Sequence, residues 1–205
     1  MDRAGTGPGR STAIPCSTTP EIDRVSTAYH EAAHALMVHG LGGVILMVDG
    51  AGQTSYARGA GYSSGALVES HLHDLVSTVV LYSGPVAEDI ARRPDEQPGT
   101  IAMVLACRTM PYVVRSRGDD SEDDLYRIGA LARRRFDSGS DGIFPYLARA
   151  ARLTEDLIRT HWEPIGQVAQ QALQCGSVDG RLFGRLVNRT VRRGGLCRAL
   201  KEACF

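Results

Sequence analysis

The sequence predicts a mainly α domain of the α+β type, with a small β-hairpin. Over most of the chain, apolar side chains recur every three or four residues, which is the spacing of one helix face. The segments with this pattern are 20–39, 69–90, 122–136, 143–175 and 180–193. Strand patterns are short and occur near 44–48 and 54–57, on either side of a glycine-rich turn. The chain has 205 residues, 43% of them hydrophobic, which is enough to bury one core.

The first helix, 20–39, has recognisable signals at both ends. Thr19 can cap its N-terminus, Pro20 suits the first helical position, and Gly40 follows the last apolar residues. The next helix, 69–90, contains the pair Gly84-Pro85. Because proline cannot donate a backbone hydrogen bond within a helix, this pair predicts a break into two pieces.

The later elements are predicted with less detail. Segment 100–108 is short and apolar, so its pattern fits either a helix or a strand. An acidic stretch, 117–124, leads into the helix 122–136. Pro164 predicts a kink or a break within 143–175.

Two tails flank a single predicted domain, 19–193. Residues 1–18 are rich in Gly, Ser, Thr and Pro without periodicity, which predicts a disordered lead. Residues 194–205 form a basic tail. From Arg181 onward there are seven basic residues and one acidic residue, and such a run is more typical of a solvated surface than of a nucleic-acid site.

The net charge, the apolar runs and the cysteines limit the classes to which this protein can belong. The chain has 23 basic and 23 acidic residues, so its net charge is zero, and we expect no nucleic acid as a partner. It contains no secretory signal and no apolar run near ~20 residues, so we expect no membrane anchor. Five cysteines without a C-x-x-C pair favour a reduced, cytoplasmic protein.

The most specific motif is His30-Glu31-Ala32-Ala33-His34, which reads H-E-x-x-H inside a predicted helix. Residues four apart lie one turn above each other, so His30 and His34 can share one Zn²⁺ ion. Glu31 leaves the helix about 100° away and could take a proton from a water on the metal. A di-iron site using Glu31 and His34 would need a second Glu-x-x-His, and the chain has none.

A catalytic zinc needs a third protein ligand. His39 lies about 140° round the helix from His34, which turns it away from the site. His71 and His73 stand at a predicted helix start, where surface positions are more common. The remaining candidates are the carboxylates Glu88, on the second helix, and Asp124, in the first turn of a later helix.

The chain resembles the peptidase domain of FtsH-type, AAA-linked zinc metallopeptidases. Residues 29–35 (YHEAAHA) are similar to the family's Y-H-E-A-G-H-A, and residues 83–89 are similar to G-G-R-A-A-E-E. Residues 122–125 resemble the S-N-D-[LI] segment. Residues 162–165 and 178–183 resemble the closing W-x-x-I and L-x-G-x-x-[LF] helices. The resemblance covers roughly 20–190 and implies a helical, zincin-like fold.

This resemblance implies that His30, His34 and Asp124 bind zinc and that Glu31 is the catalytic base. Asp123 is the fallback ligand if the register slips by one residue. Ala33 stands where the family has glycine, a small change that we expect to be tolerated. No G-x-x-x-x-G-K-[ST] motif occurs, so the family's ATP-driven unfolding is not carried over.

We therefore expect a zinc metallo-endopeptidase that hydrolyses peptides or unfolded protein segments without an ATPase of its own. A homo-oligomer and a separate ATPase are candidate partners. The strand 44–48 could pair with an extended substrate as an edge strand, or could simply be a core strand. The alternative function is a catalytically inactive, peptidase-derived binding or regulatory protein that retains the fold.

Overall fold

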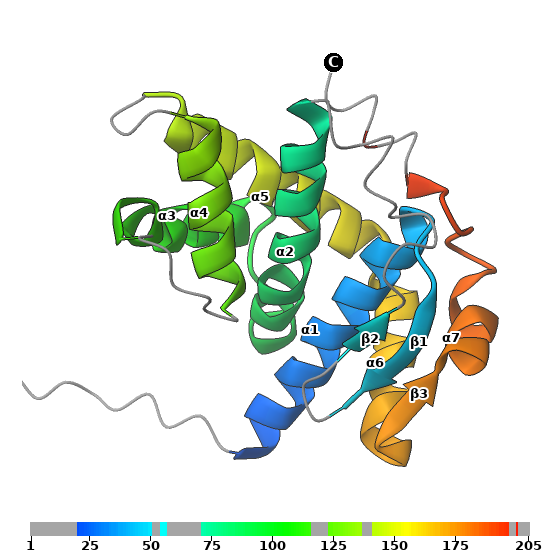
Figure 1. Cartoon of the computed structure of the whole chain (residues 1–205). Helices are drawn as coiled ribbons and strands as arrows, with labels where there is room; N and C mark the ends of the chain where they lie inside the picture. Colours follow the sequence, from blue (N-terminus) through cyan, green and yellow to red (C-terminus); the bar gives the residue numbers. More distant parts are fainter. Residues whose placement is uncertain are drawn as a thin grey trace, which may run out of the picture.

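A computed structural model describes residues 20–50, 54–56, 71–115, 123–136, 141–196 and 200. Within these ranges the chain forms seven helices and three short strands (Figure 1). The elements are α1 Pro20–Gly40, β1 Ile45–Asp49, β2 Thr54–Tyr56, α2 His71–Arg92, α3 Thr100–Arg115, α4 Asp124–Arg135, α5 Ile143–Thr160, α6 Trp162–Cys175, β3 Ser177–Asp179 and α7 Gly180–Val187. The predicted mainly α fold with a small sheet is confirmed. The predicted lead, 1–18, and most of the predicted tail lie outside the described residues.

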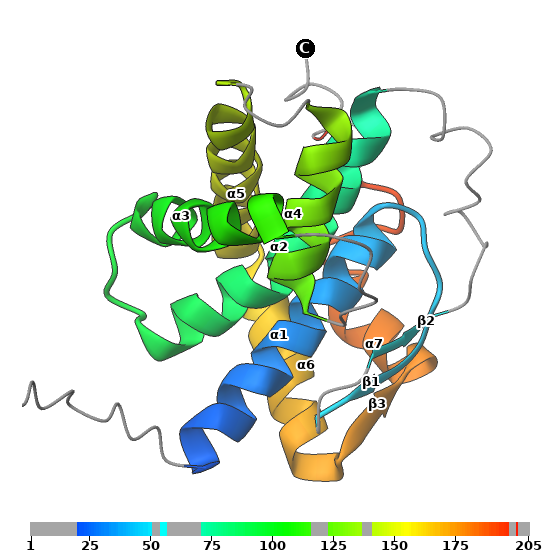
Figure 2. The ribbon, with the colours of Figure 1, turned by 60° about the vertical axis from the view of Figure 1, so that its left-hand side comes forward.

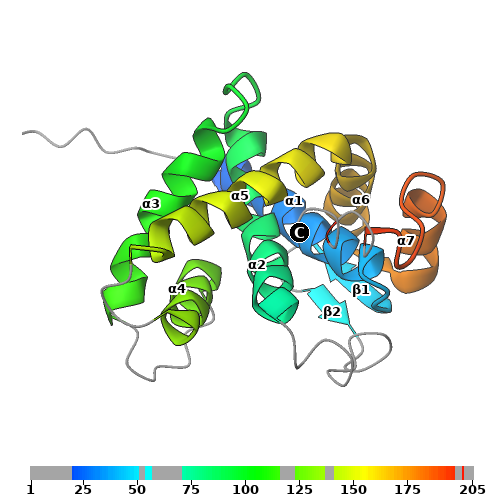
Figure 3. The same cartoon turned by 90° about the horizontal axis from the view of Figure 1, so that it is seen from above.

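Helix α1 lies at the centre of the molecule, between α2 on one side and α6 with the sheet on the other (Figure 3). Its inner faces are lined with small residues, and Ala28, Ala32, Ala33 and Ala35 are fully buried. Short side chains let neighbouring helices approach α1 closely while apolar surface leaves water. No helix in the described ranges is long and apolar enough to cross a membrane.

The sheet has the strand order β2-β1-β3, and both pairings are antiparallel. It lies beside α7, on the opposite side of α1 from α3 and α4 (Figure 2). The sequence patterns did not predict β3, because three residues are too few to show an alternation. Since β1 is paired on both sides, the edge-strand alternative for 44–48 is wrong, and the alternative of an inner strand is confirmed. At Gly180 a Cβ would collide with the Ile45 carbonyl, which explains why α7 begins with glycine there.

Helix α2 continues through Gly84 and Pro85, so the predicted break is wrong. An interior proline costs a helix about 3 kcal/mol through its missing hydrogen bond and its ring. The adjoining Tyr82, Val86 and Ala87 are fully buried against neighbouring helices. Burying large apolar side chains contributes about 1.5–3 kcal/mol each, which offsets that cost.

Other boundaries differ modestly from the prediction. α3 is a helix and runs to Arg115, past the predicted end at 108. The break between α5 and α6 falls at His161, and Pro164 lies in the first turn of α6, where proline is tolerated. α7 ends at Val187 instead of 193.

The start of α3 is held by a buried carboxylate from α5. Glu155 is fully buried and accepts hydrogen bonds from the backbone N–H groups of Gly99 (2.9 Å) and Ala102 (3.0 Å). The Nε of Arg159 donates to the same carboxylate at 2.9 Å. The first N–H groups of a helix have no partner within it, so this side chain from another helix satisfies two donors that would otherwise be buried unpaired.

Candidate metal centre

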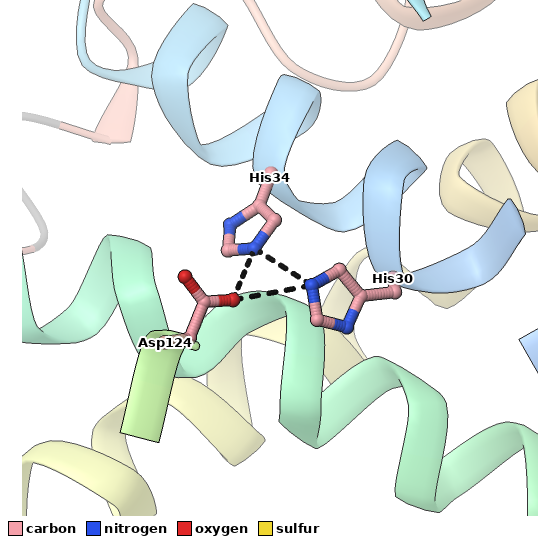
Figure 4. Close-up of side chains that lie close together, drawn as sticks. All are labelled: His30, His34 and Asp124. Atoms are coloured by element: carbon pink, nitrogen blue, oxygen red, sulfur yellow. Dashed lines mark hydrogen bonds and ion pairs between the residues drawn. The ribbon is translucent and has the colours of Figure 1, made fainter. Parts of the chain in front are cut away.

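His30 and His34 project from the same face of α1, one turn apart (Figure 4). Their Nε2 atoms lie 3.1 Å from each other, and the ring planes are inclined by 74°. Both side chains are largely buried, with 21% and 14% of their surface exposed. The helical spacing predicted from the sequence therefore brings the two imidazoles to one point.

Asp124 reaches the same point from the first turn of α4, 90 residues further along the chain. Its Oδ2 lies 3.1 Å from Nε2 of His30 and 2.9 Å from Nε2 of His34 (Figure 4). These three are the one group of metal-ligating side chains that converges within the described ranges. The structure thus brings together the three side chains that the resemblance pointed to.

Asp123, the fallback ligand, has a different task. Its exposed carboxylate accepts a hydrogen bond of 2.8 Å from the backbone N–H of Leu125 and so caps the N-terminus of α4. Capping by Asp123 fixes the start of the helix, and Asp124 then takes the first helical position. The neighbouring carboxylates point in different directions, and Asp124 alone faces the histidines.

The contacts of Nδ1 determine which ring nitrogen of neutral His34 carries the proton. Its Nδ1 lies 2.9 Å from the Val80 carbonyl, which can only accept a hydrogen bond. The Ser83 hydroxyl donates to the same carbonyl at 2.6 Å, and its oxygen lies 3.1 Å from Nδ1. Nδ1 must therefore be the donor, which leaves Nε2 of the neutral ring without a proton.

His30 is oriented in the same way by Glu88 on α2. The Glu88 carboxylate accepts from Nδ1 of His30 at 3.2 Å. That hydrogen bond and the nearby guanidinium of Arg92 outweigh burial and lower the pKa of Glu88, so the carboxylate is ionised and Nδ1 donates. Glu88, considered above as a candidate third ligand, instead contacts Nδ1 of the ring, on the side away from the site. Such carboxylate–histidine pairs are typical of metal sites.

As a result, three acceptor atoms face one another with no donor between them when both rings are neutral. Such an arrangement is repulsive unless a cation occupies the middle. In the metal-free protein a proton can take the place of that cation. Burial acts to lower the pKa of His30, but hydrogen bonds with Asp124 and Glu88 more than compensate and raise it to about 9. Burial would raise the pKa of Asp124, yet the two imidazoles hold it well below its usual range.

The donor set and its spacing suit a divalent metal ion. Ligand atoms about 2.0–2.1 Å from a tetrahedral zinc lie about 3.3 Å apart. The three separations here, 2.9 to 3.1 Å, need to open only slightly. His30, His34 and Asp124 could therefore hold a metal ion and supply three of the four ligands of a tetrahedral zinc.

Gly84 on α2 lies directly against the imidazoles. A Cβ at this position would overlap Nε2 of His30 and Nε2 of His34. The sequence analysis used Gly84-Pro85 as a helix breaker and residues 83–89 as part of the resemblance, but it did not predict the contacts of Gly84, Ser83 and the Val80 carbonyl with the imidazoles. The available signal was a glycine inside an otherwise helical, apolar pattern, which often marks a close approach.

The other candidates from the sequence lie elsewhere or are only partly described. His39, near the end of α1, is buried, with its Nε2 3.0 Å from Oδ1 of Asn188 and its ring against Phe183, and it is not a ligand. His71 and His73 are in the first turn of α2, and their side chains lie outside the described residues.

Glu31, the predicted base, is half-buried, and its charge contributes to the raised pKa of His30.

No protein-family model matches the chain, and no curated protein is significantly similar to it. The resemblance to FtsH-type peptidases therefore stays a prediction that rests on the quoted motifs.

Proposed function

We propose that the protein is a zinc-dependent metallo-endopeptidase of the FtsH-like, H-E-x-x-H type. One observation carries the proposal: the Nε2 atoms of His30 and His34 and one oxygen of Asp124 converge within about 3 Å of one another. A divalent cation resolves this arrangement, and a His₂–carboxylate set with one open position is a ligand set of catalytic zinc sites. Bound there, zinc would supply Lewis-acid activation of a water and of a peptide carbonyl group.

Glu31 is assigned the role of general base. It directly follows the ligand His30 on α1, and its carboxylate is near enough to contribute to the raised pKa of that ring. In this role Glu31 takes a proton from the attacking water and passes it to the leaving amine. Glu88 and Ser83 hold the two rings in the orientation that keeps both Nε2 atoms directed at the site.

The proposed substrates are peptides and unfolded protein segments. The 205 residues contain no nucleotide-binding G-x-x-x-x-G-K-[ST] motif, so the reaction assigned to them does not draw on ATP. Segments that are already extended need no unfolding before a peptide bond can reach the site. A separate ATPase that supplies such segments is compatible with this proposal.

The replacement Glu31→Gln tests the role of the base. It keeps the shape of the side chain but cannot accept the proton, so we expect retained zinc and a loss of peptide hydrolysis of roughly 10²-fold or more. The assay is cleavage of a quenched fluorescent peptide library, with zinc content measured on the same samples. Wild-type protein stripped by a chelator serves as the blank.

Two outcomes would contradict the proposal in different ways. Undiminished cleavage by the Glu31→Gln variant removes Glu31 from the mechanism. Stoichiometric zinc in a wild-type protein that cleaves no peptide favours the alternative, a peptidase-derived binding or regulatory protein.

A further inference from the structure

A row of polar contacts runs along the interface between α1 and α2, which pack antiparallel. His34 faces Val80 and Ser83, and His30 faces Glu88. Further toward the start of α1, Asp23 faces Arg92. The spacings follow from helix geometry: Asp23 and His30 are seven residues apart on α1, and Glu88 and Arg92 are four apart on α2, so each pair shares one face.

The contacts from His30 through Glu88 and Arg92 to Asp23 are continuous. Oε2 of Glu88 lies 3.2 Å from Nδ1 of His30, and its other oxygen, Oε1, lies 2.8 Å from Nη1 of Arg92. The second guanidinium nitrogen of Arg92, Nη2, donates to Oδ1 of Asp23 at 3.1 Å. A single planar guanidinium thus ties both carboxylates together across the two helices.

We propose that Arg92 is a positioning residue of the metal centre, which acts on His30 through Glu88. A free glutamate has three rotatable bonds, and ordering it has an entropic cost. Arg92 fixes one carboxylate oxygen and thereby directs the other at Nδ1 of His30. The inference rests on the proposed metal site, whereas the proposed function does not depend on Arg92.

Two effects of Arg92 on a bound cation oppose each other. Its positive charge repels a metal ion, while its grip on Glu88 holds the ligand ring in place. Asp23 compensates the charge, and the side chains of Arg92 and Asp23 are 34% and 48% exposed, so solvent screens the repulsion. The orienting effect therefore dominates, and removing Arg92 weakens metal binding.

Arg93 provides a matched control. It lies next in sequence and is also held between two carboxylates, with Nη2 3.0 Å from Asp89 and Nη1 3.6 Å from Glu96. Neither carboxylate contacts a ligand histidine in the described part of the chain. Arg93→Gln removes the same unit charge from the same end of α2 and leaves the Glu88 contact in place.

The experiment is a titration of metal-depleted, full-length protein with Co²⁺, followed by its absorption spectrum, and then competition with Zn²⁺. We expect Arg92→Gln to keep one metal per chain but to bind it roughly threefold to tenfold more weakly, at or below the lower end of the range for outer-shell partners. Arg92→Lys is expected to be intermediate, and Arg93→Gln unchanged. In a Glu88→Gln background, Arg92→Gln should add little, because its path to His30 is already lost.

Each result decides something. Unchanged or tighter binding by Arg92→Gln, an equal loss in Arg93→Gln, or full additivity with Glu88→Gln overturns the role of Arg92 and leaves the proposed function standing. A wild-type protein that binds no metal overturns both. If Arg92→Gln does not fold, Asp23→Asn, which loosens only the outer contact, is expected to weaken metal binding about twofold, and an unchanged affinity overturns the inference.

Discussion

Glu155 and Asp124, two of the carboxylates on the described helices, have surroundings that are opposite in character. Glu155 on α5 is fully buried and surrounded by donors: two backbone N–H groups at the start of α3 and the Arg159 guanidinium. Asp124 on α4 faces the Nε2 atoms of His30 and His34, which carry no proton when the rings are neutral. One carboxylate finds its donors in the chain itself, and the other is stabilised by a proton on a neighbouring imidazole or by a metal ion.

This difference separates a structural group from a functional one. A carboxylate surrounded by donors lowers the free energy of the folded state directly, since its partners would otherwise be buried unpaired. Among acceptors, the same group is stabilised only when a proton or a metal ion joins it. Burial and charge alone do not distinguish the two cases, because both side chains are largely buried. The proton positions of the neighbouring groups do.

The largest expected effect on the metal side is that of Asp124→Asn. An apparent zinc-binding free energy of about 10–16 kcal/mol is shared among the ligands. Loss of one ligand should therefore cost roughly 3–5 kcal/mol, or about 10²-fold to 4 × 10³-fold in affinity. The metal-free protein should also lose some stability, because the attraction between Asp124 and protonated His30 is lost, although an asparagine amide can still hydrogen-bond to an imidazole. Competition titration with a zinc chelator measures the affinity.

Asp123→Asn is the control for this replacement. Asparagine also caps helices, and position 123 does not face the histidines, so this variant should bind zinc as the wild type does. Equal loss of affinity in both variants would place the metal elsewhere than at Asp124.

Glu155→Ala should instead lower the stability of the fold and leave the zinc affinity unchanged. It leaves the N–H groups of Gly99 and Ala102 and the Arg159 guanidinium without their acceptor, so the free energy of unfolding should fall by about 3–5 kcal/mol. Denaturant unfolding in the presence of a chelator measures this loss. The folded fraction should keep its zinc affinity, and a variant that is stable but unable to bind zinc would erase the contrast between the two sites.

The smallest expected effect is the pH dependence of metal binding. The pKa of His30 in the metal-free protein is raised to about 9, so near neutral pH its ring carries a proton that a metal must displace. Because a raised pKa favours the protonated form, affinity should increase with pH, by up to about tenfold per unit below about pH 9. Calorimetry in buffers of different ionisation enthalpy should record close to one proton released. Affinity that stays constant over this range would contradict the assignment of the proton to the site.

The parts of the site that lie within one helix could be predicted from the sequence. His30 and His34 are four residues apart, and helical periodicity alone places them on one face. Asp124 became a candidate through its position at a helix start and through a resemblance, but its approach to α1 depends on how α4 packs. Asp123 and Asp124 were hard to separate, because only the cap geometry shows which carboxylate is engaged by the backbone.

What the sequence did not predict involves contacts between distant segments. Gly84-Pro85 fits a helix breaker equally well, and its position against two imidazoles depends on the packing of α2 on α1. Strand β3 is three residues long and is held by pairing with β1. In each case the energy that decides the structure comes from tertiary packing, which local patterns do not contain.

The most direct test of the metal centre is an anomalous-difference map recorded at the zinc edge from crystals grown with zinc. We expect one strong peak with Nε2 of His30, Nε2 of His34 and a carboxylate oxygen of Asp124 each about 2.0–2.1 Å away. An empty position between these atoms, or a peak coordinated by other residues, would contradict the account.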